Sequence, residues 1–573
     1  MAEFKRVVIT TNGQALMAKL MSGTGTVKFT KIGVSSTKYT DAQLEGLTSI
    51  SSIKQYAPIT NVSRTNGVAI TVEGAISNET LTTGYYMETI GLYALDPDAG
   101  EILYAVSNAS VSGYMPPFNN RTPSGAQFKL TTTVGNSTNV TLQIDPAAVA
   151  TIGDITRLET RITNVEAYVG YTEAGVLGLE ADFENNKFTR IADAVGRTPG
   201  ASFDGFNMFG GRKRVNLADN GTVNAYFGDP AYIEDGTNGQ VMVEQPIFYY
   251  KVVPLKTERI TDGKGHSLMK VRYYVSGAPR AGFKIHPAFK DENGKVRQKV
   301  YVSAFEASIY DTSGLAYLKL DEQIADFATD KLSSIAKAKP ASGATQNLTR
   351  ENARKLAQNR GAGWQQMTMA TASMSQLLFA IEYASFNSQS MIAMGVTSLT
   401  DDGTTNQGYL TGETPTLGNA SGYVTKDTQT VPTYRGEENL WGNLWGIVDG
   451  FTLEGNNRND GWIANGAYTE NGTSGSYKPI GFTVAKVSGY VKYFGYSEDA
   501  DYIFVPAKTG SGASTALPVG DYEYVSPTYG GFLLARLGGS WINGANAGLF
   551  GWSLKDAFSD RNRYFGARLV YAP

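Results

Sequence analysis

The sequence contains no cysteine and only two histidines among its 573 residues. The lack of cysteine excludes disulfides, thiolate metal sites, iron–sulfur clusters and cysteine nucleophiles. His266 lies in a Gly-Lys-Gly-His-Ser turn and His286 in an apolar segment, so both are expected to be structural or solvated. With so few nitrogen and sulfur ligands, a transition-metal site is not expected.

Long apolar runs and long basic runs are also missing. We therefore expect neither a signal peptide nor membrane insertion, and synthesis in a cytoplasm. The net charge is −3, and the short basic cluster at residues 212–214 is interpreted as a solvated turn. General nucleic-acid binding is not expected from this charge pattern.

Glycine (64 residues) and tyrosine (33 residues) are abundant, whereas charged residues make up only 18%. This composition favours many short strands and tight turns over helical bundles. Tyrosine, serine, glycine and asparagine are also the residues of binding loops, in which rigid aromatics give contact area at little entropic cost. A chain of this length is expected to form two to four domains.

Residues 1–150 show period-two alternation bounded by glycine, asparagine and serine, which predicts a mostly β domain. Three segments carry a resemblance: residues 9–16 (ITTNGQAL), 29–34 (FTKIGV) and 87–94 (METIGLYA). They resemble the N-terminal domain of phage tail-collar fibre proteins, and the resemblance implies attachment to a phage tail or baseplate. An unrelated β domain is the alternative.

Residues 151–187 show apolar positions spaced by three and four, interrupted at Thr172. This pattern predicts a short coiled-coil linker, because a single amphipathic helix would leave its seam in water. The spacing is compatible with two or three strands, and a homotrimer is favoured for a fibre; a lone helix packed on a domain is the alternative. The predicted seam consists of Ile155, Leu158, Ile162, Val165, Val169, Val176, Leu179 and Phe183.

Residues 188–285 are predicted to be a β-rich connecting region, which forms either the entry strands of the next region or a small connecting domain. Residues 286–573 are predicted to form the largest domain, which holds all six tryptophans. Helices are predicted over residues 349–359 and 372–385. Six segments of the last region resemble the C-type lectin fold in its formylglycine-generating-enzyme-like branch: 284–289, 360–364, 377–383, 434–443, 446–450 and 537–541. Enzymes of that branch use their own cysteines, so the resemblance implies their scaffold here but not their chemistry.

Residues 537–573 also resemble the variable proteins of diversity-generating retroelements, notably phage tropism determinants. That resemblance implies a fixed framework with scattered variable positions on a receptor-binding face, exposed by strand alternation such as Trp552-Ser553-Leu554-Lys555. An ordinary polar strand surface is the alternative. The candidate receptor-binding residues are Ser540, Ile542, Asn543, Asn546, Gly551, Ser553, Lys555, Asp556, Ser559, Asp560, Arg563 and Tyr564.

A candidate calcium site combines hard oxygen ligands in one glycine-rich segment, which suits that ion. Its residues are Asp449, Asn456, Asn457, Asn459 and Asp460, with a weaker cluster at Asp401, Asp402 and Asn406. Neither cluster follows helix–loop–helix spacing, so ordinary turns made by asparagine and aspartate side chains are the alternative. No other cofactor is expected.

The sequence as a whole predicts a multidomain, mainly β protein with α+β character. Its three parts are a β-rich attachment domain, a short coiled coil and a C-terminal C-type-lectin-like domain. The resemblances imply a phage tail-fibre receptor-binding protein, located at the virion tail tip, that binds a bacterial surface glycan or protein and catalyses nothing. Two alternatives remain: a polysaccharide depolymerase, which needs paired carboxylates in a groove, and a structural baseplate spacer.

Overall fold

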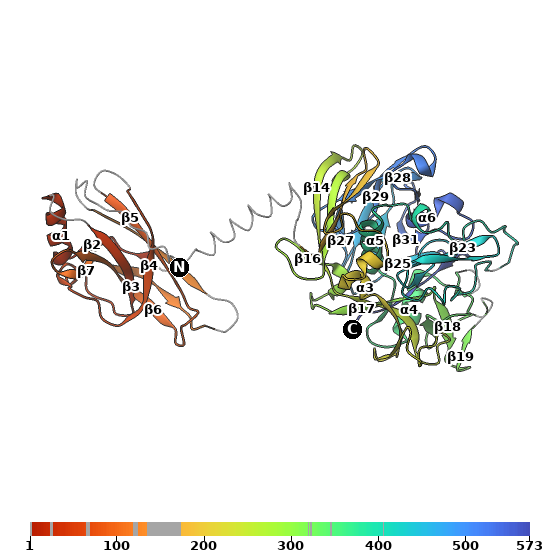
Figure 1. Ribbon diagram of the computed structural model, residues 1–573, viewed down its shortest axis with the longest axis horizontal. Coiled ribbons are helices and arrows are strands. Elements are labelled where there is room, and N and C mark those ends of the chain that lie inside the picture. The colour runs from red at the N-terminus through yellow and green to blue at the C-terminus, as the bar shows by residue number, and fades with distance from the viewer. Residues whose placement is uncertain are drawn as a thin grey trace. The chain divides into compact units, whose positions relative to one another are not determined.

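The computed structural model divides the chain into two compact units, Met1–Ile162 and Thr163–Pro573 (Figure 1). The described residues are 3–22, 27–64, 69–118, 124–133, 174–318, 320, 324–343, 346–404, 406–470 and 472–573. The coiled-coil residues Ile155, Leu158, Ile162, Val165 and Val169 lie outside these ranges. No helix in the described part of the chain is long and apolar enough to cross a membrane.

Unit 1 is an antiparallel sheet with the order β1-β7-β6-β3-β4-β5-β8, to which β2 adds beside β7. The alternating residues bury one side of each strand in a common core around Ile32, Val72 and Leu92. A helix, α1 (Thr11–Met21), is capped by the Thr10 hydroxyl, which accepts a hydrogen bond from the Gly13 amide. The strands are β1 (Glu3–Phe4), β2 (Val8–Ile9), β3 (Lys28–Ser35), β4 (Ile53–Arg64), β5 (Ala69–Ser77), β6 (Tyr85–Asp96), β7 (Gly100–Met115) and β8 (Gly125–Thr133).

The described part of unit 2 begins with a hairpin where the sequence pattern predicted the end of a coiled coil. Val176 and Leu179 lie in strand β9 (Val176–Asp182), which pairs with β10 (Lys187–Ala192) and β15 (His266–Ser276), and Phe183 follows it. The heptad prediction is therefore wrong for these three residues. Their side chains are buried against neighbouring strands and the core of the unit, not against a partner helix.

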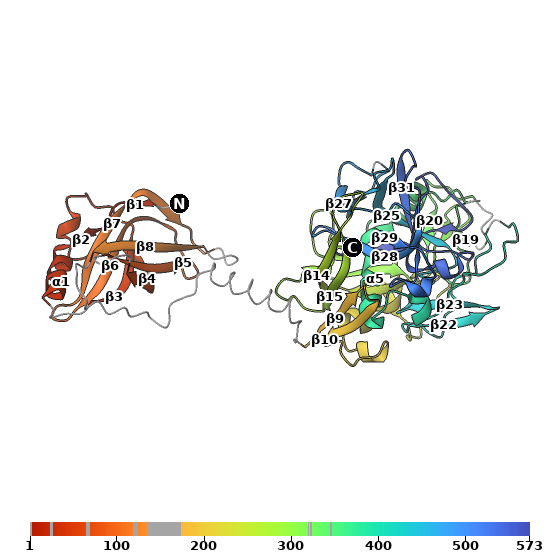
Figure 2. The ribbon, with the colours of Figure 1, turned by 90° about the horizontal axis from the view of Figure 1, so that it is seen from above.

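The largest sheet of unit 2 follows the order β10-β9-β15-β28-β30-β32-β31-β25-β26-β27. Shorter strands β14, β16, β29 and β33 pair beside this path, and Figure 2 shows β9, β10, β14 and β15 side by side. Strand bounds not yet given are β14 (Tyr249–Arg259), β16 (Lys284–Ile285), β25 (Trp445–Glu454), β26 (Asp460–Ile463), β27 (Lys478–Thr483), β28 (Gly489–Tyr496), β29 (Pro506–Gly510), β30 (Tyr522–Val525), β31 (Phe532–Gly538), β32 (Gly548–Leu554) and β33 (Phe565–Gly566).

A second sheet, in the order β12-β11-β13-β17-β34-β21, joins strands from both sides of the boundary predicted at residue 286. Its strands are β11 (Lys213–Leu217), β12 (Val223–Tyr226), β13 (Gln240–Pro246), β17 (Lys299–Ser303), β21 (Trp364–Gln366) and β34 (Leu569–Tyr571). Because β13 pairs directly with β17, residues 188–285 are part of the same unit as residues 286–573.

Two small sheets complete the strands: β18 (Ser308–Asp311), β19 (Ala316–Leu318) and β20 (Lys331–Ser333), then β22 (Gly422–Lys426), β23 (Gln429–Tyr434) and β24 (Glu437–Glu438).

The two predicted helices are confirmed as α4 (Arg350–Gln358) and α5 (Met369–Tyr383). Helix α5 lies in the interior of unit 2 in both views (Figures 1 and 2), and nearly all of its residues are buried. It begins three residues earlier than predicted, because Thr368 and Thr371 form a capping box. Short helices α3 (Asn207–Gly210) and α6 (Ser388–Met391) lie elsewhere in the unit.

Candidate functional site

The C-terminal stretch after β31 turns through two glycines and returns as β32. Gly538 and Gly539 have φ angles of +101° and +82°, which favour glycine. The turn also leaves no room for a side chain at Gly539, since an added Cβ would lie 2.5 Å from the Ala547 Cβ. Beyond the turn Trp541 is fully buried and its amide donates to the Asn443 carbonyl. This arrangement fixes the segment between β31 and β32 on the body of the unit.

Three of the twelve candidate receptor-binding residues are not on a surface. Ser540, Gly551 and Ser553 are buried, and every residue of β32 is buried. The predicted in–out alternation is wrong for this strand because β32 lies between β30 and β31 and both of its faces are covered. Ser553 instead accepts a hydrogen bond from the buried Arg536 guanidinium at 2.8 Å.

The other nine candidates are at least partly exposed: Ile542, Asn543, Asn546, Lys555, Asp556, Ser559, Asp560, Arg563 and Tyr564. Several of them serve local structure. Asp556 forms an ion pair with buried Arg536, and Arg563 with Asp401. The Tyr564 ring packs edge-on against Trp541.

Asn543, Asn546 and Lys555 converge on three half-buried tyrosines that the sequence analysis did not identify: Tyr490 on β28 and Tyr522 and Tyr524 on β30. Consecutive rings lie 5.1 Å and 4.6 Å apart, in the order 490, 522, 524. We call these six residues the tyrosine face. The alternation Tyr522-Glu523-Tyr524 was the only sequence signal for it.

Asn546 ties the rings of the tyrosine face together. Its Oδ1 accepts from the Tyr490 hydroxyl at 2.6 Å, and its Nδ2 donates to the Tyr524 hydroxyl at 2.8 Å. Asn543 donates to the same Tyr524 oxygen at 3.3 Å, and the Lys555 ammonium lies 5.3 Å from the centre of the Tyr524 ring. These contacts hold the aromatic and polar side chains in fixed positions. The side chains therefore lose less conformational entropy when a ligand binds.

Beneath the tyrosine face, two carboxyl groups are buried: Glu523 on β30 and Asp521, which immediately precedes that strand. Glu523 is fully buried with no hydrogen-bond partner for either carboxyl oxygen among the described residues, and Asp521 accepts from the Phe550 amide at 2.7 Å. Burial raises the pKa of both side chains well above their ordinary values. Burial therefore favours the neutral form of both carboxyl groups.

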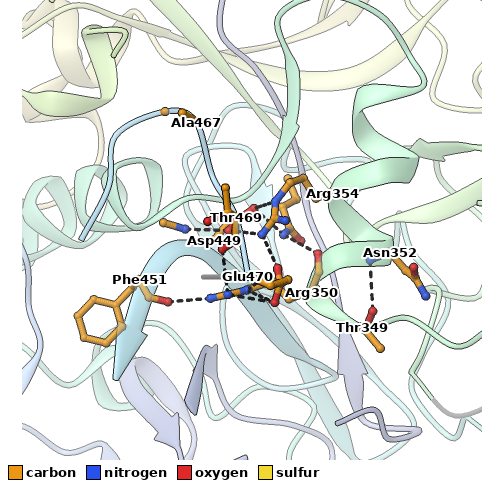
Figure 3. A network of polar contacts seen from close by, with 12 residues as sticks. Thr349, Arg350, Asn352, Arg354, Asp449, Phe451, Ala467, Thr469 and Glu470 are labelled. Carbon is orange, nitrogen blue, oxygen red and sulfur yellow. Dashed lines mark hydrogen bonds and ion pairs between the residues drawn. The ribbon is translucent and has the colours of Figure 1, made fainter. Parts of the chain in front are cut away.

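The predicted calcium ligands are not brought together. Asp449 is fully buried and its carboxylate is bound by Arg354, in a network that also joins Arg350 and Glu470 (Figure 3). Burial alone would raise the pKa of Asp449, but hydrogen bonds from Arg354 and the nearby positive charges hold it below its ordinary value. Asp449 is thus satisfied by guanidinium groups, and its assignment as a metal ligand is wrong.

The remaining predicted ligands have local roles. Asn456, Asn457 and Asn459 all have φ angles between +52° and +62°, which asparagine tolerates in tight turns. Asp460 forms an ion pair with Lys264 at 3.0 Å. Asp401 and Asp402 cap their own loop through backbone amides, and Asn406 donates to the Pro340 carbonyl. Among the described residues, no three histidine or acidic side chains are grouped in a way that could hold a metal ion.

His286 is fully buried among the rings of Phe248, Tyr250, Phe289 and Tyr502. Its Nδ1 accepts a hydrogen bond from the Ala288 amide, and burial lowers the pKa of His286 to about 3. This histidine is a neutral part of the core.

The first part of the chain matches a known protein family. Residues 1–153 match the family described as phage tail-collar fibre protein, N-terminal. These residues therefore form a tail-collar fibre N-terminal domain. No curated protein matches the chain.

Two solved structures are similar to part of this chain. The Major Tropism Determinant U1 Variant shares 12% identity with a TM-score of 0.22, covering 63% of this chain and 72% of that one. The Major Tropism Determinant M1 Variant shares 12% identity with a TM-score of 0.23, covering 63% and 71%.

Proposed function

We propose that this protein is a receptor-binding protein of a phage tail fibre. In this proposal the N-terminal domain docks to the tail or baseplate, the heptads of residues 155–169 assemble a homotrimer, and unit 2 is a C-type-lectin-like adhesin. The match of residues 1–153 to a tail-collar fibre domain supports the docking role and a location on the virion tail.

The tyrosine face is the observation that carries the binding role. Three adjacent rings give rigid apolar contact area, and the amides of Asn543 and Asn546 and the ammonium of Lys555 add polar groups beside them. Asn543, Asn546 and Lys555 belong to the segment whose sequence resembles variable receptor-binding proteins. Each head can bind weakly, because three linked copies raise the effective concentration at a cell surface.

Binding of the labelled full-length protein to a panel of bacterial strains tests this proposal. On any strain that binds, Asn546→Leu and Lys555→Ala should each lower binding about tenfold, which corresponds to about 1.4 kcal/mol. Lys426→Ala is the matched control, because Lys426 also lies over a tyrosine ring, at 5.4 Å from the centre of Tyr409. If all three variants bind equally well, the tyrosine face is not the receptor-binding site.

The diversification part of the proposal has a genetic test. A near-repeat of the codons for residues 537–573, lying beside a reverse-transcriptase gene, should differ from the gene at adenines. The differences should fall on codons for exposed residues such as Asn543, Asn546 and Lys555 rather than for buried Ser553. Without such a repeat, the protein is an adhesin of fixed specificity.

A further inference from the structure

A small pocket lies at the far edge of the largest sheet, where β26 and β27 meet the loop between β14 and β15. It encloses about 180 Å³. This is below the ~300–1,000 Å³ of pockets for drug-sized ligands, so it has room for one small ring-shaped molecule. Its lining combines Trp462, Pro479 and Phe482 with four charged side chains: Lys264, Glu454, Arg458 and Asp460.

The apolar part of the pocket is built by cross-strand pairing. Trp462 on β26 lies opposite Pro479 on β27, and the Trp462 side chain is partly exposed. Its Nε1 is shielded from solvent and has no hydrogen-bond partner among the described residues. What the indole offers a ligand is therefore its ring carbon surface, which suits stacking against a flat apolar face.

The charged part of the pocket is balanced. The Lys264 ammonium lies 3.0 Å from the Asp460 carboxylate, and the Arg458 guanidinium lies 2.8 Å from the Glu454 carboxylate. Arg458 also lies 4.0 Å from Asp460, so the four groups form one chain of alternating charge. A charged ligand would have to displace an existing ion pair, whereas a neutral ligand can hydrogen-bond to carboxylate oxygens and ammonium or guanidinium groups together.

We propose that this pocket binds a neutral sugar ring, as a saccharide subsite separate from the tyrosine face. A pyranose has an apolar face of C–H groups to place on Trp462 and a rim of hydroxyls that both donate to Asp460 and Glu454 and accept from Lys264 and Arg458. An aromatic ligand would leave the charged rim without partners, and a small ion would gain nothing from the indole. The proposal does not depend on the receptor-binding role of the tyrosine face.

Saturation-transfer NMR on the full-length protein tests the subsite. The probes are glucose, galactose, mannose and N-acetylglucosamine, with glucuronic acid and glucosamine as charged counterparts. At least one neutral sugar should bind with a dissociation constant on the order of 1 mM, and the charged counterparts of that ring should bind more weakly. Absence of signal from every neutral sugar, or stronger binding of a charged counterpart, would overturn the proposal.

Four variants separate the pocket from general effects on the fold. Trp462→Ser should abolish the signal, and Asp460→Asn should weaken binding severalfold. Arg458→Ala should also weaken binding, and it is a safe change because the Arg458 side chain is 59% exposed. Tyr423→Ser is the matched control, since it removes an aromatic residue that is 51% exposed on another strand. Unchanged binding in both Trp462→Ser and Arg458→Ala would place the sugar elsewhere.

Discussion

Arg354 and Asp449 form a two-point ion pair in the interior of unit 2, with Nε–Oδ2 and Nη2–Oδ1 distances of 2.6 Å and 2.9 Å. The pair joins helix α4 to strand β25, and Gln366 on β21 donates to the same carboxylate at 3.0 Å. A carboxylate shared in this way is fully occupied by protein donors.

Replacing Asp449 by alanine is expected to destabilise unit 2 strongly. The change removes the buried counter-ion of Arg354 and leaves this arginine only the partly exposed Glu470, and breaking a buried pair costs about 3–5 kcal/mol. The change in the free energy of unfolding can be measured by urea unfolding followed by tryptophan fluorescence. This signal reports on unit 2, because all six tryptophans lie in residues 364–552. A loss below about 1 kcal/mol in the free energy of unfolding would mean that Glu470 alone compensates the charge of Arg354. Calcium or a chelator should leave the wild-type midpoint unchanged.

From the burial of the Glu523 carboxyl group we predict that the folded protein becomes less stable as the pH is raised. The unfolded side chain releases its proton near pH ~4.3, whereas burial keeps the folded one protonated to a much higher pH. Between these two pKa values the unfolded state binds fewer protons, so stability falls by about 1.4 kcal/mol per pH unit and then levels off. The stability difference between Glu523→Gln and the wild type should therefore grow from pH 5 to pH 8. A constant difference would show that Glu523 is already ionised in the folded protein.

From the burial of the His286 ring we predict that the folded protein becomes less stable as the pH falls into the acid range. Its pKa falls from about 6.5 in the unfolded chain to about 3 in the folded protein. The stability that this shift contributes is present above the unfolded value and is lost by about 1.4 kcal/mol per pH unit as the pH falls toward 3. The variant His286→Asn does not take up a proton, so its unfolding midpoint should depend less on pH between 6.5 and 4. Parallel curves for the two proteins would contradict this prediction.

The heptads of residues 155–169 remain a prediction that sedimentation can test. The full-length protein should sediment as a trimer, and Ile162→Asp should give monomers, because a charge in the seam cannot be solvated there. Ser559→Asp adds the same charge at an exposed residue of unit 2 and should leave the trimer intact. A wild-type monomer would make the coiled-coil prediction wrong.

Local patterns in the sequence determined several elements correctly. Thr349 caps α4 as predicted, because a threonine hydroxyl before an apolar-periodic run accepts a hydrogen bond from one of the free amides in the first turn, here that of Asn352. The alternation in residues 1–150 predicted a β domain, and the described strands β1 to β8 fall within it. Capping and alternation act over a few residues, so a single sequence carries them.

Tertiary structure alone decided which side chains form the site. Ser553 and Asn546 are both polar residues of the same segment. Ser553 is buried and its hydroxyl accepts from the Arg536 side chain on β31, whereas Asn546 meets tyrosines from β28 and β30. The spacing of Val176 and Leu179 suited a helix as well as a strand, and pairing with β10 and β15 selected the strand. Asp449 was a plausible calcium ligand until the fold placed Arg354 beside it. In each case at least one deciding partner lies on another element well separated in the sequence, and periodicity carries no information about such partners.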